Sequence, residues 1–311
     1  EVAAVASARF EAGQNFAREA LGCSTSTDNT TIRIGSHCVW ARTVGVVIDN
    51  DASREFPAYK WQAGSVKVGG QTEIQPDLEM AASLGYESGR LNASGSRVRA
   101  SSDTGLALAG LRYRTGPWTF DGILDFAFGG LTTQRTIAEA GFATAAGKSQ
   151  VFSTGLHLRA AYTVPLGGFY VEPALELDAS YVRIGGYTES GATPFNLKVS
   201  ALQDVVLAAT PGARFGSQFQ LGPNASANVY GGVGVSFLHG NNFEVDARFA
   251  AVSSAAGGFR STFSNDNVVG RFTAGVDVAT VAGVSLGVQY QGRRSSHQTE
   301  HGGQARFAYR F

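Results

Sequence analysis

An alternating stretch, VSLGVQYQGR at residues 284–293, decides the fold class of this chain. Its apolar side chains are Val284, Leu286, Val288 and Tyr290, and each is followed by a small or polar residue. Successive side chains of a β-strand point to opposite faces, so a period of two predicts a strand with one apolar face and one wet face.

Carboxylates keep to the polar side of this pattern in two other segments, residues 118–128 and 169–183. The residues concerned are Asp121, Asp125, Glu172, Glu176 and Asp178. From residue 36 onward, twelve segments with this alternation follow one another, which predicts an all-β chain.

The connections between these segments distinguish two all-β folds. Tight turns rich in Gly and Pro lie at residues 75–77, 115–117, 165–168, 221–224 and 282–283. Long polar connections alternate with them near residues 48–57, 89–103, 130–149, 184–199 and 240–265. Short turns at one rim and long loops at the other are typical of outer-membrane barrels. We therefore predict a twelve-stranded antiparallel transmembrane β-barrel over residues 36–311, with a water-soluble sandwich as the alternative.

Aromatic residues stand near the ends of many apolar faces. They are Trp40, Tyr59, Trp61, Tyr86, Tyr113, Trp118, Phe169, Tyr181 and Phe237. Rings with an apolar body and a polar edge settle at the two interfaces of a bilayer, so we expect these side chains at the membrane surfaces.

The composition excludes several classes of protein. Charged residues make up 16% of the chain, where soluble domains average about 25%. Basic and acidic residues number 25 each, so no net field draws the molecule onto nucleic acid. Every apolar run is interrupted well before the roughly 18 residues that predict a transmembrane helix.

Residues 1–22 differ from the rest of the chain. They are rich in Ala, Glu, Gln and Arg and end at Gly22, which predicts a helix. Charged side chains are mixed into every face, which favours a plug in a polar space over a helix packed on a surface. The start, Glu1-Val2-Ala3, has no signal-peptide pattern, so the chain is expected to be mature or part of something longer.

Cys23 and Cys38 are the two thiols of the chain. Cys23 begins a connecting segment, residues 23–35, Cys38 follows it, and no His-rich cluster lies near them. A disulfide suits an oxidising compartment, and two reduced thiols are the alternative.

No motif predicts an enzyme, a cofactor or a metal ion. The chain has no Walker or His-Glu-x-x-His pattern and no Gly-x-Ser-x-Gly elbow between a predicted strand and a predicted helix. His297 and His301 are the closest pair of histidines, and on a strand they would stand about 13 Å apart. We therefore expect no shared metal.

The last strand carries an aromatic side chain at every second position. Phe307, Tyr309 and Phe311 share one face, opposite Arg306 and Arg310. A terminal Phe with such spacing resembles the assembly signal of outer-membrane barrels.

Short pieces along the chain resemble, in order, the C-terminal translocator domain of autotransporters, the type V secretion system of Gram-negative bacteria. They are Val39-Trp40-Ala41-Arg42, Gly69-Gly70-Gln71-Thr72, Leu84-Gly85-Tyr86, Phe169-Tyr170-Val171-Glu172-Pro173, Pro211-Gly212-Ala213-Arg214 and the terminal Phe307-Ala308-Tyr309-Arg310-Phe311. The resemblance extends over residues 1–311 and departs from most members at the two Cys.

The resemblance implies that the N-terminal helix threads the lumen of the barrel and that an upstream passenger is exported to the cell surface. Both termini of the barrel would then lie on the periplasmic side of the outer membrane. The implied partners are outer-membrane lipid, the barrel assembly machinery and the chain's own passenger, with the barrel as a monomer. Some members cut their passenger with Asn and acidic residues; Asn15 keeps this open, although the paired-Asn site is missing.

Seven charged residues are predicted to face the lumen and to solvate the helix, or simply to hold water there. They are Arg159, Glu172, Glu176, Asp178, Arg271, Asp277 and Arg306. Two functions other than export stay open from the sequence, namely a small-solute pore plugged by the helix and an adhesin that works through its long loops.

Overall fold

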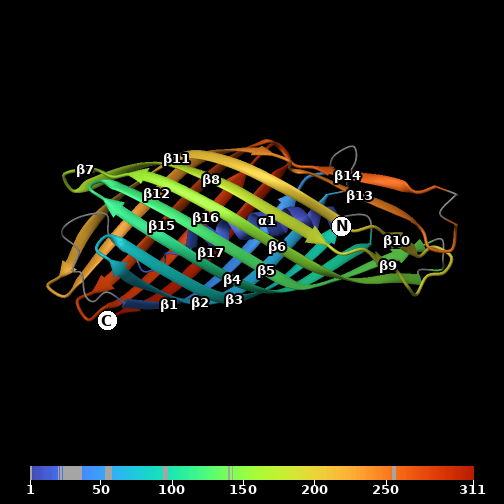
Figure 1. The fold of residues 1–311 in the computed structure, drawn as a ribbon, viewed down its shortest axis with the longest axis horizontal. Helices are drawn as coiled ribbons and strands as arrows, with labels where there is room; N and C mark the ends of the chain where they lie inside the picture. The colour runs from blue at the N-terminus through green and yellow to red at the C-terminus, as the bar shows by residue number, and fades with distance from the viewer. Residues whose placement is uncertain are drawn as a thin grey trace.

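The computed structural model describes residues 2–19, 21, 23, 37–52, 58–93, 97–138, 141, 143–253 and 257–311. It contains one α-helix, α1 (Val2–Glu19), and a large antiparallel β-sheet (Figure 1). The predicted connecting segment, residues 23–35, falls outside the described residues except for Cys23.

Twelve long strands form the wall of a closed barrel. They are β1 (His37–Asn50), β2 (Tyr59–Gln75), β3 (Leu78–Ala93), β4 (Val98–Thr115), β5 (Trp118–Ile137), β6 (Ala143–Tyr162), β8 (Phe169–Ile184), β11 (Leu202–Gly222), β12 (Ala225–His239), β15 (Val268–Thr280), β16 (Val284–Arg294) and β17 (Gln298–Arg310). Each pairs antiparallel with its neighbours, β8 pairs with β11, and β17 pairs with β1. The predicted twelve-stranded antiparallel barrel is confirmed.

The closing seam brings the two ends of the barrel chain together. Trp40 of β1 stands opposite Ala308 of β17, and the backbone N–H groups of His37 and Phe311 each donate to the other residue's carbonyl, at 3.2 and 2.9 Å. Closure leaves no exposed sheet edge in the barrel wall, which is the condition for a β-structure to cross a bilayer.

The two ends of the barrel differ. The end that holds His37 and Phe311, called the turn end here, has two-residue turns such as Pro76-Asp77 and Gly116-Pro117 and the short strand β7 (Val164–Leu166). Gly116 adopts a φ of 55°, a conformation that favours glycine in such a turn.

At the opposite end, called the loop end here, a second sheet extends beyond the barrel (Figure 1). This loop sheet has the order β14-β13-β10-β9 and consists of β9 (Tyr187–Thr188), β10 (Leu197–Val199), β13 (Asn242–Phe249) and β14 (Phe259–Ser264). These residues lie in two of the predicted long polar connections, 184–199 and 240–265, and the sequence did not predict this sheet.

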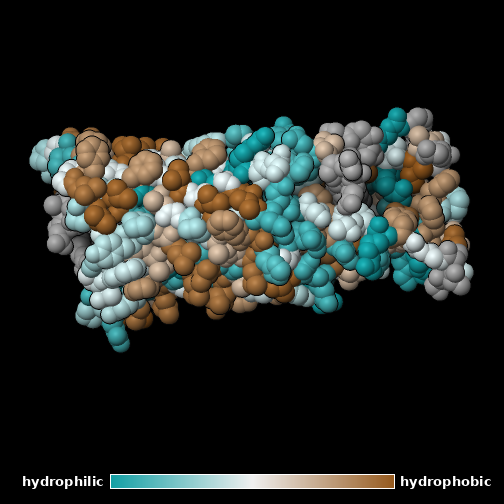
Figure 2. Space-filling view, turned by 90° about the horizontal axis from the view of Figure 1, so that it is seen from above, coloured by the Kyte–Doolittle hydropathy of each residue, from teal (hydrophilic) through white to brown (hydrophobic). Residues whose placement is uncertain are grey.

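The alternation along the strands separates an apolar outer face from an inner face. Leu286 and Val288 are 57% and 55% exposed on the outside, whereas Ser285 between β15 and β17 is buried inside. Figure 2 shows apolar side chains gathered over the barrel and a hydrophilic band between them and the loop sheet. Within the described residues, no helix has the length and apolar character needed to span a bilayer.

Three of the aromatic residues expected at the membrane surfaces lie inside the barrel instead. Trp40, Tyr59 and Trp61 are each 3% exposed, and the expectation for them was wrong. Trp40 packs beside the two cysteines, while Tyr59 and Trp61 pack in the buried cluster around α1. An apolar stretch of lumen thus accepts rings that would otherwise face lipid.

Candidate functional site

The lumen of the barrel holds α1 along its axis. Residues 2–11 of the helix are all buried, and Ala4, Val5, Ala6 and Ser7 have no exposed surface at all. Small side chains suit this position, because a helix with long side chains measures about 10–12 Å across. The helix occupies the passage through the barrel.

The half of α1 nearest the loop end sits in an apolar collar. We use this term for the buried residues Tyr59, Trp61, Leu91, Leu131, Val151, Val182, Ile184, Leu202, Val206, Phe243 and Phe263, which cluster with the first turns of the helix. Phe243 and Phe263 belong to the loop sheet, which therefore closes over the helix. The Asn265 side chain donates to the Ser7 hydroxyl at 2.8 Å.

The polar surroundings expected for the helix are therefore wrong for its first half. The collar contacts the small apolar residues from Val2 to Ala8, and the charged residues of α1 begin only at Arg9. Three ion pairs mark the change. Arg9 contacts Glu87 of β3 at 2.8 Å, and Arg293 lies between Glu11 and Glu300 at 3.3 and 3.2 Å.

One helical turn later, polar side chains of α1 reach the barrel wall. Asn15 donates to Glu300 at 3.0 Å, and Gln14 donates to Asp178 at 2.8 Å. These contacts hold the helix at one height and one rotation within the lumen, because each pairs a fixed helix position with a fixed strand position.

His157 of β6 joins two of the carboxylates that face the helix. Its Nδ1 lies 2.7 Å from Asp178 and its Nε2 lies 2.6 Å from Asp125. Gly155 makes room for this arrangement, because a Cβ there would stand 2.4 Å from the Asp125 carboxylate. The cluster ties β5, β6 and β8 together beneath the helix.

The seven predicted lumen charges all lie on the inner face and have polar partners. Glu176 contacts Arg18 of the helix at 2.8 Å, and Arg306 contacts Asp277 at 2.8 Å. Arg159 pairs with Glu172, and Asp178 and Arg271 both bond Gln14. Each of the seven thus has a polar side-chain partner among the described residues.

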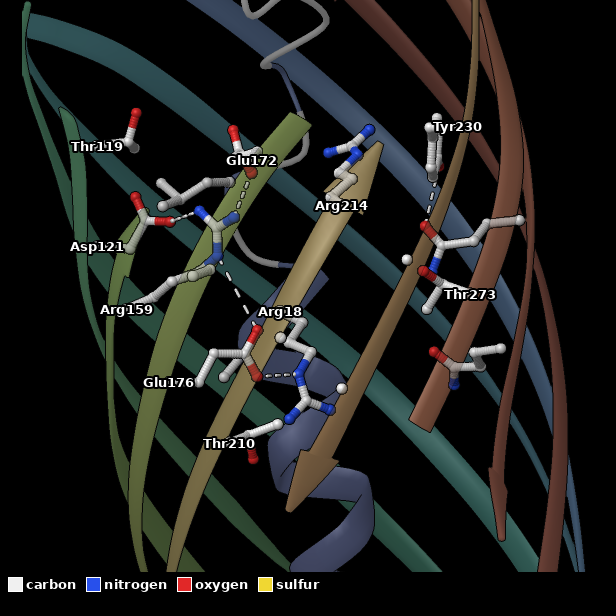
Figure 3. A pocket seen from close by; sticks show the side chains of 18 of the residues that line it. Arg18, Thr119, Asp121, Arg159, Glu172, Glu176, Thr210, Arg214, Tyr230 and Thr273 are labelled. Carbon is white, nitrogen blue, oxygen red and sulfur yellow. Dashed lines mark hydrogen bonds and ion pairs between the residues drawn. The ribbon is translucent and has the colours of Figure 1, made fainter. Parts of the chain in front are cut away.

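Between Arg18 and the turn end the lumen widens into a cavity of about 980 Å³. Figure 3 shows Arg159 reaching from one wall toward Glu172 and Glu176, with Arg18 of the helix beside Glu176 and Arg214 and Tyr230 on other strands. The guanidinium of Arg214 lies 3.9 Å from the centre of the Tyr230 ring. The lumen is thus apolar around the first turns of the helix, and many charged side chains line this cavity.

A disulfide between Cys23 and Cys38 links the chain just beyond α1 to the start of β1. It packs against Trp40 and Ala308, and Arg310 donates to the Cys23 carbonyl at 2.7 Å. The bond fixes the turn-end side of the helix to the barrel seam.

Several residues that contact α1 or the His157 cluster were not predicted from the sequence, among them Glu87, His157, Arg293 and Glu300. Alternation places each of them on an inner face, so that signal was available. Their pairing with particular helix residues depends on the height of α1 in the barrel, which no local pattern reports.

The arrangement suits occlusion and anchoring. Within the described residues, no group of three or more His, Cys, Asp or Glu side chains is placed to hold a metal ion. The predicted assembly residues lie on the outer face, where Phe307, Tyr309 and Phe311 are exposed.

Comparison with known proteins gives a consistent result. The family model described as the autotransporter beta-domain matches residues 39–291. The chain is similar to the translocator domain of the autotransporter NalP from Neisseria meningitidis, with a TM-score of 0.78, 16% identity and coverage of 100% of this chain and 98% of that one. No curated protein sequence matches.

Two further solved structures have the same fold. The beta domain of the Bordetella autotransporter BrkA has a TM-score of 0.66 and 18% identity, covering 89% of this chain and 100% of that one. The transport unit of AIDA-I from Escherichia coli has a TM-score of 0.56 and 10% identity, covering 96% and 97%.

Proposed function

The chain belongs to the autotransporter beta-domain family, and on that premise we propose that it anchors an upstream passenger and mediates its export, with α1 as the last exported segment. The domain plan follows: residues 1–22 form the plug, 23–35 connect it to the wall, and 36–311 form the outer-membrane barrel. One observation carries the proposal. The helix runs through a closed barrel, with its first residue at the loop end and its last at the turn end.

The orientation proposed for the barrel places the turn end in the periplasm and the loop end at the cell surface. Short periplasmic turns and long outer loops are the usual arrangement in such barrels. Both barrel termini, His37 and Phe311, would then be periplasmic. The exposed Phe307, Tyr309 and Phe311 would be available to the barrel assembly machinery before insertion.

Occlusion after export is the state that the contacts of α1 support. The apolar collar excludes water at the loop end, and the ion pairs of Arg9 and Glu11 hold the helix beneath it. A helix held in this way lets the barrel keep an anchored chain without opening the membrane to solutes.

Single-channel recording tests this proposal against a small-solute pore. The whole chain and a variant without residues 1–22 are compared in planar bilayers. We expect small, infrequent openings from the whole chain and large, stable ones from the variant. Large, stable openings from the whole chain would favour the pore.

A further inference from the structure

The lipid-facing wall of the barrel carries a groove of about 400 Å³ that is unrelated to the lumen. It crosses four neighbouring strands, β6, β8, β11 and β12. The side chains that rise around it are Leu156, Leu158, Leu177, Leu207 and Phe237. All five are exposed on the outer face, so the groove opens toward the bilayer.

The strand register explains why a groove forms here. Ala179 of β8 stands between Leu156 and Leu207 on the neighbouring strands, and Ala209 of β11 stands between Leu177 and Phe237. These two small side chains lie on adjacent strands and are two residues apart in register, so they leave a diagonal slot between the larger side chains. Within a membrane, van der Waals contact decides which apolar partner binds a surface. A flexible hydrocarbon chain can follow a diagonal slot and contact the side chains on both sides of it.

Basic side chains stand at the loop end of the slot. His239, the last residue of β12, lines the groove itself, and Arg183 is exposed on the outer face of β8, four residues beyond Ala179. Four residues of strand correspond to about 13 Å. Neither side chain forms an ion pair with any other residue that the structure describes.

Aromatic rings mark the same height of the wall. Phe152 and Tyr181 are in ring contact on the outer face, with centroids 6.3 Å apart. Such rings settle where hydrocarbon meets headgroups. Arg183 follows Tyr181 by two residues toward the loop end, so its guanidinium belongs to the headgroup layer.

We propose that this groove binds one acyl chain of a phosphorylated lipid of the outer leaflet, with its phosphate held by Arg183 and His239. Guanidinium groups bind phosphate through paired hydrogen bonds, which supplies the selectivity that the apolar slot lacks. The inference rests on the proposed orientation, because only then does the loop end face the outer leaflet. The groove is filled by lipid and not by a second copy of the chain.

Native mass spectrometry of the whole chain tests the proposal, with bisphosphorylated lipid A and lipid A stripped of both phosphates as the probes. We expect one retained copy of lipid A. The double variant Ala179→Leu/Ala209→Leu fills the slot and should bind it at least about tenfold more weakly. Ala160→Leu, an equal change on the outer face of β6 beyond the slot, should bind it as the unaltered chain does.

The headgroup contacts are tested separately by Arg183→Gln/His239→Gln. This variant should bind lipid A about tenfold more weakly. Its affinity for the dephosphorylated lipid A should equal that of the unaltered chain. The heat-dependent mobility of the barrel on a gel shows whether the slot-filling variant folds. If that variant does not fold, Arg183→Gln/His239→Gln still tests the proposal.

Three results would overturn the inference: undiminished binding to the slot-filling variant, equal binding of the two lipids by the unaltered chain, or dimers in place of lipid adducts. None of these results would contradict the proposed export function. The slot-filling variant should still display a passenger at the cell surface, so failure of the lipid site and failure of the proposed function are distinguishable.

Discussion

Arg9 of the helix and Glu87 of strand β3 form an ion pair at 2.8 Å where the apolar collar gives way to the polar lumen. The Arg9 side chain is 2% exposed. A charge buried to this degree is stable only beside its partner. The pair therefore sets the depth at which the helix rests in the barrel.

Loss of one partner should loosen the helix strongly. We expect Glu87→Gln to weaken the docking of α1 by about 3–5 kcal/mol, because it leaves Arg9 buried without its carboxylate. Hydrogen exchange of the α1 amides measures the change. The double variant Arg9→Met/Glu87→Gln removes both charges and should recover much of the protection; equal exchange in the single variant and the unaltered chain would contradict the role of this pair.

The disulfide should restrain the helix without being needed by the barrel wall. Cys23 and Cys38 are separated by 15 residues, and closing a loop of that size is worth about 3 kcal/mol in the chain-entropy model. Cys23→Ser/Cys38→Ser should raise the frequency of channel openings while the barrel keeps its heat-dependent gel mobility. Reductant should have the same effect on the unaltered chain and none on the variant. An unchanged frequency of openings in the variant and in the reduced chain would show that the disulfide does not restrain the helix.

Strand β13 offers a matched pair of phenylalanines, one in the apolar collar and one outside it. Phe243 is 0% exposed against the helix, whereas Phe249 is 44% exposed. Truncating a buried Phe to Ala costs about 3–5 kcal/mol, so Phe243→Ala should increase hydrogen exchange in the first turns of α1. Phe249→Ala should leave that exchange unchanged. If both variants behave alike, the loop sheet does not seal the helix.

A pH dependence is expected at the loop end, where Asp266 accepts hydrogen bonds from the backbone and the side chain of His297 at 2.9 and 3.0 Å. Burial alone would raise the pKa of Asp266, but the hydrogen bonds from Ser295 and His297 outweigh it and hold that pKa below its usual value. The folded-state pKa is the lower one, so this contribution is present above the unfolded-state pKa of about 3.9 and is lost as the pH falls through the folded-state value.

Acidification below about pH 4 should therefore release the segment around His297. Hydrogen exchange of the His297 amide, corrected for its intrinsic pH dependence, reports this release. Asp266→Asn should exchange faster at neutral pH and lose the acid-dependent step. A step that persists in Asp266→Asn would assign it to another group.

Alternation predicted the barrel because it is a local property of each strand. Leu286 and Val288 face outward as expected, and the twelve-strand count holds. The same rule misplaced Trp40, Tyr59 and Trp61, because it assumes a wet lumen and part of this lumen is apolar. A period of two separates two faces of a strand; it does not say what lies against each.

The helix–wall contacts and the loop sheet could not be predicted, because they depend on residues that are distant in sequence. Arg293 meets Glu11 of the helix, and Asn265 meets Ser7, only because the barrel closes around α1 at one particular height. The loop sheet was also missed, because its four strands are short and come from two separate polar connections. Such strands are stabilised by one another and by the helix beneath them.

Export with the helix left in the lumen is the central claim, and protease accessibility on intact cells tests it most directly. A reporter domain fused upstream of Glu1 is expressed together with the barrel, and protease is added outside the cells. We predict that the reporter is removed, while α1 stays protected together with the barrel. A reporter that resists protease until the outer membrane is permeabilised, in cells whose barrel is folded and inserted, would contradict the account.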